Sequence, residues 1–178
     1  MPNPIDLSTI AAGTGGFVIH GQDAYDQSGL SVASAGDING DGFGDLIIGA
    51  VFNPPIGTPD AGKSYVVFGN SSSFGAAVDL TTIAAGMGGF VIHGQDVSDE
   101  FGSSVASAGD INGDGFGDLI IGARYGDAAG NAKSAAGDSY VIFGKSLNPP
   151  TNTATQIFNT EGGGVEAAGR IRVMADFS

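Results

Sequence analysis

Apolar residues occur along this chain in short stretches of strand length, and none is long enough for a long helix. Two stretches are continuous runs rich in β-branched and aromatic residues, which suits buried strands. In a third stretch, residues 30–36, the pattern alternates and the side chains are small throughout. Leu80 and Ile83 have the i, i+3 spacing of a single helical turn, which we expect to cover an edge. The predicted strands of this all-β unit are 30–36, 45–49, 65–68 and 90–93.

The unit occurs twice. Residues 5–50 align with 78–123 at a spacing of 73 and agree at about 38 of 46 positions, after which the spacing becomes 75. A constant period of this length indicates a propeller or a related repeat array. The second copy supplies three further strands, at 105–109, 119–123 and 140–143.

The chain begins and ends out of phase with its own repeat. Phe17–His20 matches the fourth strand of a unit whose first three strands are missing, and the second copy lacks a recognisable fourth strand near residue 165. A further strand is expected at 169–175, where polar and apolar residues alternate. The predicted segments are an orphan fourth strand that can act as a donor strand (1–21), repeat 1 (22–94), a three-stranded repeat 2 (95–150) and a divergent C-terminal segment (151–178).

Each copy contains the same nine-residue loop, Asp-Ile-Asn-Gly-Asp-Gly-Phe-Gly-Asp, between its first two strands. Oxygen side chains stand at positions 1, 3, 5 and 9, and a carbonyl at position 7 adds another donor. Calcium takes six to eight such hard oxygens in a flexible geometry. We therefore predict two Ca²⁺ sites. Their ligands are Asp37, Asn39, Asp41, Phe43 (carbonyl) and Asp45 in the first copy, and Asp110, Asn112, Asp114, Phe116 (carbonyl) and Asp118 in the second.

Other interpretations of the loop fit less well. An EF-hand needs an acid at position 12, where this chain has Ile48 and Ile121, and it needs flanking helices rather than strands. Mg²⁺ demands a smaller and stricter octahedron. A turn rich in Asp and Asn that binds no metal stays open as the alternative.

Composition restricts the function classes. The net charge is −13, from 19 acidic and 6 basic residues, which excludes binding to nucleic acid and disfavours anionic membranes. The chain has no cysteine and no apolar run long enough to span a membrane. Its start lacks the basic and apolar regions of a secretion signal. We expect an extracellular or cell-surface location, where calcium is abundant, with a removed signal, a longer parent chain or another export route.

The repeat resembles the FG-GAP repeat of integrin α-subunit β-propellers and their bacterial relatives. The resemblance covers roughly residues 5–145 and rests on Phe101-Gly102, the acidic loop, 119–123 and 140–144. It implies propeller blades of four antiparallel strands, with a Ca²⁺ loop at one rim of each blade. The first copy departs from the pattern with Ser28-Gly29, where we expect Leu30 to fill the same face. The third residue of the family's Gly-Ala-Pro is also replaced in both copies, by Val51 and by Arg124.

Two loops vary between the copies: 22–29 against 95–102, and 51–64 against 124–139. The resemblance implies that they share the rim opposite the calcium loops. Loops on a rigid frame commonly carry binding specificity. Arg124 and Tyr125 are the leading candidates for contact with a glycan or protein ligand, against the alternative of an ordinary exposed arginine.

No catalytic residues are predicted. His20 and His93 are equivalent repeat positions, so we interpret both as structural, and no nucleophile motif is present. Four acids outside the calcium loops are expected to be solvated loop residues or turn caps rather than a glycosidase pair. They are Asp23, Asp26, Asp96 and Asp99.

About two blades cannot close a ring, because propellers have four to eight blades. The chain is a fragment, or several chains form a ring, or strand 17–21 pairs with the second repeat of a neighbouring chain. The predicted function is a calcium-stabilised extracellular module for self-assembly or adhesion, without enzymatic activity. The alternatives are an adhesin that binds carbohydrate or protein through its variable rim, and an accessory part of a larger propeller or hydrolase.

Overall fold

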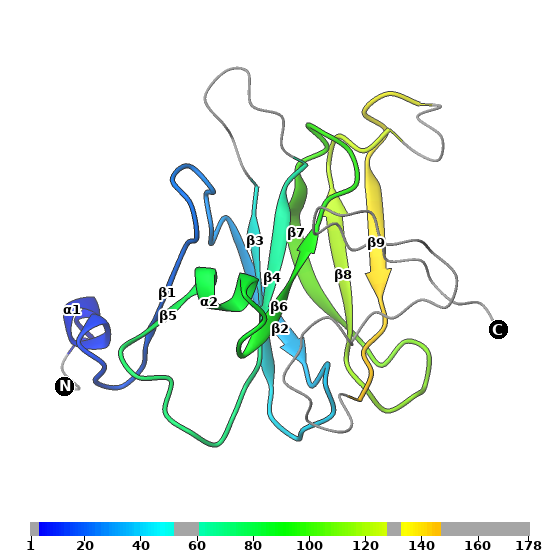
Figure 1. Ribbon diagram of the computed structural model, residues 1–178. Helices are drawn as coiled ribbons and strands as arrows, with labels where there is room; N and C mark the ends of the chain where they lie inside the picture. Colours follow the sequence, from blue (N-terminus) through cyan, green and yellow to red (C-terminus); the bar gives the residue numbers. More distant parts are fainter. Residues whose placement is uncertain (1–3, 52–60, 128–132, 147–178) are drawn as a thin grey trace.

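A computed structural model describes residues 4–51, 61–127 and 133–146. These residues form an all-β structure with two one-turn helices (Figure 1). In chain order the elements are α1 (Leu7–Ala11), β1 (Val18–His20), β2 (Ser31–Gly36), β3 (Asp45–Ala50), β4 (Lys63–Val67), β5 (Ala77–Asp79), α2 (Leu80–Ala84), β6 (Gly89–His93), β7 (Phe101–Gly109), β8 (Asp118–Ala123) and β9 (Asp138–Ile142).

The predicted four-stranded antiparallel unit is confirmed. Strands β2-β3-β4-β6 form one sheet, called blade 1 here, and β7-β8-β9 form a second sheet, blade 2. The register shifts at the same repeat position in both blades, between Ser34 and Gly36 and between Ser107 and Gly109. This irregularity ends the first strand of each blade directly before the acidic loop, so the repeat is reproduced in backbone detail.

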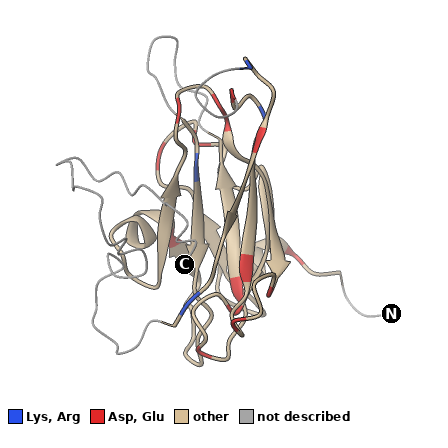
Figure 2. Cartoon of the chain, turned by 90° about the vertical axis from the view of Figure 1, so that its right-hand side faces the viewer, with Lys and Arg blue, Asp and Glu red and all other residues tan. Residues whose placement is uncertain are grey.

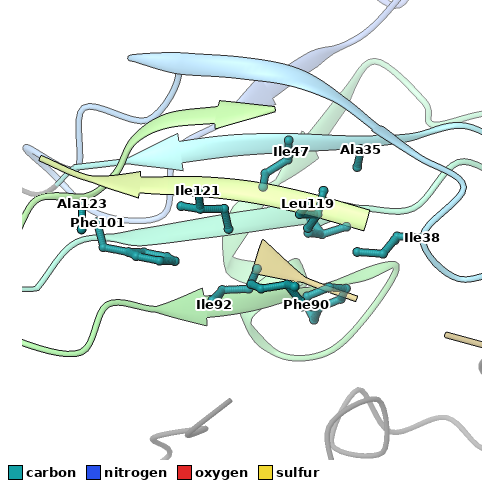
Figure 3. Packing of buried hydrophobic residues seen from close by; sticks show 11 residues of the cluster. Ala35, Ile38, Ile47, Phe90, Ile92, Phe101, Leu119, Ile121 and Ala123 are labelled. Atoms are coloured by element: carbon teal, nitrogen blue, oxygen red, sulfur yellow. The ribbon is translucent and has the colours of Figure 1, made fainter. Parts of the chain in front are cut away.

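The two blades pack face to face. Side chains alternate across each strand, so each blade has two faces. We call the face directed toward the next blade along the chain the leading face and the opposite face the trailing face. The leading face of blade 1, with Ile47 and Val66, contacts the trailing face of blade 2, with Leu119, Ile121 and Ile142. Figure 3 shows the side chains of this cluster between the strands of the two blades. The largest core is therefore the interface between blades.

The trailing face of blade 1 is covered differently. Its outer part packs under α2, whose Leu80 and Ile83 are buried against Tyr65. A segment that the sequence analysis did not predict, β5, runs parallel to β1. Within the described residues β1 thus pairs with β5 and with no strand of either blade, and Phe17 stacks on Phe74 with ring centroids 4.4 Å apart.

The helix α1 was also missed, although it is the repeat counterpart of α2. Each helix begins at an aspartate cap, Asp6 or Asp79, whose carboxylate accepts a backbone N–H two residues on. The helix α2 confirms the turn predicted from Leu80 and Ile83. Leu7 and Ile10 have the same i, i+3 spacing, so the repeat carried the signal for α1 as well. The predicted strand at 169–175 lies outside the described residues.

The Phe-Gly and Gly-Ala pairs of the repeat meet at the blade interface. A Cβ added at Gly49 would lie 2.1 Å from the carbonyl oxygen of Gly102, so only glycine allows this approach. Phe101 is buried beside it and meets Tyr140 edge-on at 5.5 Å. The expectation that Leu30 fills the equivalent face of the first copy is wrong in this chain, because Leu30 is 59% exposed.

Candidate metal centre

The two acidic loops occupy equivalent places, between β2 and β3 and between β7 and β8. They lie at the same end of the two blades, and Figure 2 shows acidic residues gathered in the turns at that lower end. Gly40 and Gly42 have φ of +73° and +88°, and their counterparts repeat these values closely. Such left-handed turns, which glycine adopts without strain, let the chain double back around its own side chains.

The first aspartate organises each loop. Asp37 accepts backbone N–H groups from Gly40 at 2.8 Å, Asp41 at 3.0 Å and Gly42 at 2.9 Å. Its counterpart Asp110 makes the same three bonds in the second loop. The position-1 carboxylate is thus held at the centre of the turn.

Positions 3 and 5 are coupled to each other. The Asn39 amide donates to a carboxylate oxygen of Asp41 at 3.0 Å, and the other oxygen of Asp41 accepts the N–H of Phe43 at 2.8 Å. Asn112 and Asp114 repeat the amide contact at 2.8 Å. The polar ends of these side chains therefore lie within hydrogen-bonding reach of one another.

The position-9 aspartates tie the loops to the sheets. Asp45 is 1% exposed and accepts N–H groups from Ile38 at 2.9 Å and Gly69 at 2.8 Å. Asp118 makes the equivalent pair of bonds. Burial raises the pKa of Asp45 to about 6, against the effect of its two N–H donors, and the nearby charges of Asp41 and Asp37 raise it further.

The donor set fits a hard cation. All the polar side chains at the predicted positions offer oxygen, and the first loop contains three aspartates, Asp37, Asp41 and Asp45. Their oxygens accept backbone N–H groups, and in the described residues no three acidic or histidine side chains converge closely enough to hold a metal ion. The loop thus presents suitable ligands in a compact turn, and their assignment to a metal remains a prediction.

The two loops also touch. The N–H of Gly117 donates to the carbonyl of Asp37 at 2.8 Å. The ring of Phe116 lies against Gly40 so closely that an added Cβ would fall 2.2 Å from it. The counterpart of Phe116, Phe43, is 41% exposed. Blade 2 therefore braces the first loop, while the second loop has no such support within the described chain.

The variable loops lie at the opposite ends of the strands, and ion pairs cross-link them. Lys63 lies 3.3 Å from Asp23 and 3.4 Å from Asp26. Arg124 pairs with Glu100 at 2.6 Å and lies over the Tyr125 ring at 4.6 Å. The proposed ligand contact Arg124 is thus already engaged, although it stays 58% exposed.

Of the four acids expected to be solvated loop residues or turn caps, two are buried rather than solvated, and one of these, Asp26, caps a turn by accepting the N–H of Asp23 at 3.2 Å. Asp26 is 2% exposed and Asp99, its repeat counterpart, is 5% exposed. Lys63 compensates Asp26, whereas the position equivalent to Lys63 in blade 2 is Asp138. Burial, followed by the charges of Asp96 and other neighbouring acids, raises the pKa of Asp99. The sequence signal for this site was the lysine-to-aspartate difference between the copies.

Face-to-face blades with an acidic loop at one rim define a protein of the propeller-blade repeat class. A family profile described as the FG-GAP repeat matches residues 28–67 and 101–142, the cores of the two blades. The chain carries FG-GAP repeats of the integrin α type, as the resemblance in the sequence indicated.

Three relatives illustrate the similarity. Phosphatidylinositol-glycan-specific phospholipase D of Bos taurus is 36% identical over 121 residues, 67% of this chain and 14% of that protein. Integrin alpha-PS5 of Drosophila melanogaster is 35% identical over 114 residues, 64% of this chain and 10% of its own. Integrin alpha pat-2 of Caenorhabditis elegans is 37% identical over 127 residues, 70% and 10% respectively. The chain therefore spans a small part of each relative. Among the described residues no helix is long and apolar enough to cross a membrane.

Proposed function

We propose that this chain is a calcium-stabilised, extracellular FG-GAP module that acts in assembly or adhesion and has no catalytic role. The observation that carries the proposal is the duplicated acidic loop, in which a buried aspartate, Asp45 or Asp118, shares a nine-residue turn with two further aspartates. A bound Ca²⁺ would neutralise that charge. Asp37, Asn39, Asp41, Asp45 and the Phe43 carbonyl would hold the ion in the first loop, and the equivalent residues in the second.

The position of the loop supports a structural role for the proposed ion. Asp45, the first residue of β3, accepts hydrogen bonds from the N–H of Ile38, shortly after β2, and from that of Gly69, after β4. A cation held there would fix the first two strands of the blade and the segment that follows the third. The integrin-type relatives support the adhesive and extracellular parts of the proposal, while binding of a glycan or protein is assigned to the opposite, variable rim.

Thermal unfolding with and without calcium tests the proposal. Addition of Ca²⁺ after EGTA treatment should raise the melting temperature, and the double variant Asp41→Ala, Asp114→Ala should not respond. Both side chains are exposed, so the variant should fold and match the metal-free protein. Magnesium at the same concentration is the matched control and should give a smaller rise. A melting temperature indifferent to calcium would refute the metal assignment.

A second candidate is a propeller segment of a larger hydrolytic enzyme. It is favoured by the similarity to phosphatidylinositol-glycan-specific phospholipases D, of which the chain covers a small part. In that case the blades would support or position a catalytic domain elsewhere. A parent reading frame that encodes such a domain would favour this candidate.

A further inference from the structure

The leading face of blade 2 is exposed where its counterpart in blade 1 is buried. Ile120 and Val141 are 39% and 41% exposed, whereas Ile47 and Val66, the same residues in blade 1, are both fully buried. The two faces have the same side chains, so the difference comes from what packs on them. Blade 2 covers the leading face of blade 1, and in the described chain no blade covers that of blade 2.

The trailing face of blade 1 shows the converse difference at its calcium-loop end. Leu46 is 38% exposed, whereas its counterpart Leu119 is fully buried against blade 1. Leu46 lines a hollow together with Phe43, Val67 and Phe17. This hollow lies on the same surface that, in blade 2, receives the preceding blade.

The loops repeat the pattern. Gly40 is filled by the Phe116 ring of the next blade, whereas its counterpart Gly113 has no atom within 4 Å of an added Cβ. Ile38 is 3% exposed and its counterpart Ile111 is 60% exposed. Blade 2 thus has an uncovered surface at Gly113 and Ile111 on which the loop of another blade can pack. Blade 1 has an exposed phenylalanine, Phe43, at the position equivalent to Phe116, which fills this site in blade 1.

The strand edges are complementary as well. In blade 1 the fourth strand β6 pairs with β4, but in the described residues no strand pairs with the outer edge of β9. The repeat counterpart of β6 is β1. Ile19 of β1 packs on the trailing face of blade 1, in the same way as Ile92 of β6 packs near the trailing face of blade 2. So β1 already lies where the fourth strand of a preceding blade belongs, with only β5 beside it.

We propose that two copies of this chain join head to tail. The leading face of blade 2 in one copy packs on the trailing face of blade 1 in the next copy, and β1 of the next copy becomes the fourth strand of the composite blade. The second copy is the occupant that the structure favours, because the contact repeats the interface already present between blades 1 and 2. The inference rests on the assembly part of the proposed function and specifies its geometry.

The register follows from blade 1. There Tyr65 pairs with Val91 and Lys63 with His93. The equivalent pairs across the two copies are Tyr140 with Val18, and Asp138 with His20. The composite blade therefore pairs an aspartate, Asp138, with His20, whereas blade 1 pairs a lysine, Lys63, with His93.

Complementation between variants tests which faces meet. Val141→Lys should block the receptor side, and Leu46→Lys the other side; both side chains are exposed, so each variant should remain folded. Val97→Lys, at a side chain 52% exposed in the variable rim, is the control and should assemble as the wild type does. Light scattering coupled to size-exclusion chromatography, in calcium, should show oligomers for the wild type. Each interface variant should associate at least tenfold more weakly.

An equal mixture of the two interface variants should recover heterodimers of twice 17.6 kDa and nothing larger, because each variant retains one intact face. A wild type that stays monomeric, a mixture that stays monomeric, or interface variants that assemble like the control would overturn the proposal. The calcium response of monomeric Val141→Lys is read separately. If calcium raises its melting temperature while the mixture fails to associate, the metal role stands and the head-to-tail contact is wrong.

Crosslinking tests the register in a chain that has no native cysteine. His20→Cys combined with Asp138→Cys should form a ladder of disulfide-linked chains on mild oxidation, because paired residues across antiparallel strands bring their Cβ atoms close. Ile19→Cys with Asp138→Cys places the thiols on opposite faces of the sheet and should give at least tenfold less product. Equal yields, or no ladder from the first pair, would contradict the predicted pairing.

Discussion

The two acidic loops have identical sequences but differ in support, so we predict that the Ca²⁺ sites proposed for them have unequal affinity in the monomer. The first loop is braced by Gly117, which donates to Asp37 at 2.8 Å, and by Lys145, which donates to Ile38 at 3.0 Å. Asn39 is 7% exposed there. In the second loop Asn112 is exposed. A loop held in its binding conformation loses less entropy when it takes up the ion.

The expected magnitude follows from mass action. Extracellular modules bind calcium with Kd on the order of 10⁻⁴–10⁻³ M. At about 10 mM calcium, each site then stabilises the fold by about 1.4–2.7 kcal/mol. We assign the upper value to the first loop and the lower to the second. For a chain of this size, about 1 kcal/mol corresponds to roughly 2–4 °C in melting temperature, so both sites together raise it by roughly 8–16 °C.

Single-loop variants measure the difference. Asp41→Ala should remove about two thirds of the calcium-dependent rise in melting temperature, and Asp114→Ala about one third, with the two variants indistinguishable in EGTA. Titration calorimetry of the wild type at low protein concentration should resolve two affinities. If Asp114→Ala loses as much of the calcium response as Asp41→Ala, or more, bracing by the next blade does not tune the site and the reasoning is refuted.

Three further outcomes concern the variable rim. Lys63→Met should destabilise the fold by about 3–5 kcal/mol, because it leaves Asp26 buried without its cation, and adding Asp26→Asn should restore most of the loss in urea unfolding. Asp138→Lys should stabilise blade 2 by placing a cation near the buried Asp99. The pKa of Asp99 is raised, so the fold loses stability as the pH rises from the ordinary pKa of an aspartate through the raised pKa of Asp99. The variant should therefore flatten the pH dependence of the melting temperature in that window. Arg124→Ala should change stability by less than about 1 kcal/mol, because its ion pair is exposed, and a larger loss in the same assay would assign the arginine a structural role.

The sequence predicted the strands of both blades because buried β-runs and a long repeat are strong local signals. It did not predict β5, which is three residues long and has meaning only as a neighbour of β1. The burial of Asp26 and Asp99 was not predicted, because burial depends on which side chains approach from other loops, and Lys63 is 37 residues further along the chain than Asp26. The identical sequence of the two loops predicted their shared chemistry. It could not predict their different exposure, because the first loop packs against the next blade and the second does not within the described residues.

The placement of the two kinds of loop has a consequence for recognition. The acidic loops and the variable loops lie at opposite ends of the strands, and the proposed head-to-tail contact would preserve that polarity from copy to copy. An assembly would then present identical variable rims side by side, all facing the same way. Linked sites of this kind gain avidity of about 10²–10⁴ over a single site when the ligand spans them. Weak contacts by single rims would then suffice for firm attachment to a surface that carries many ligands.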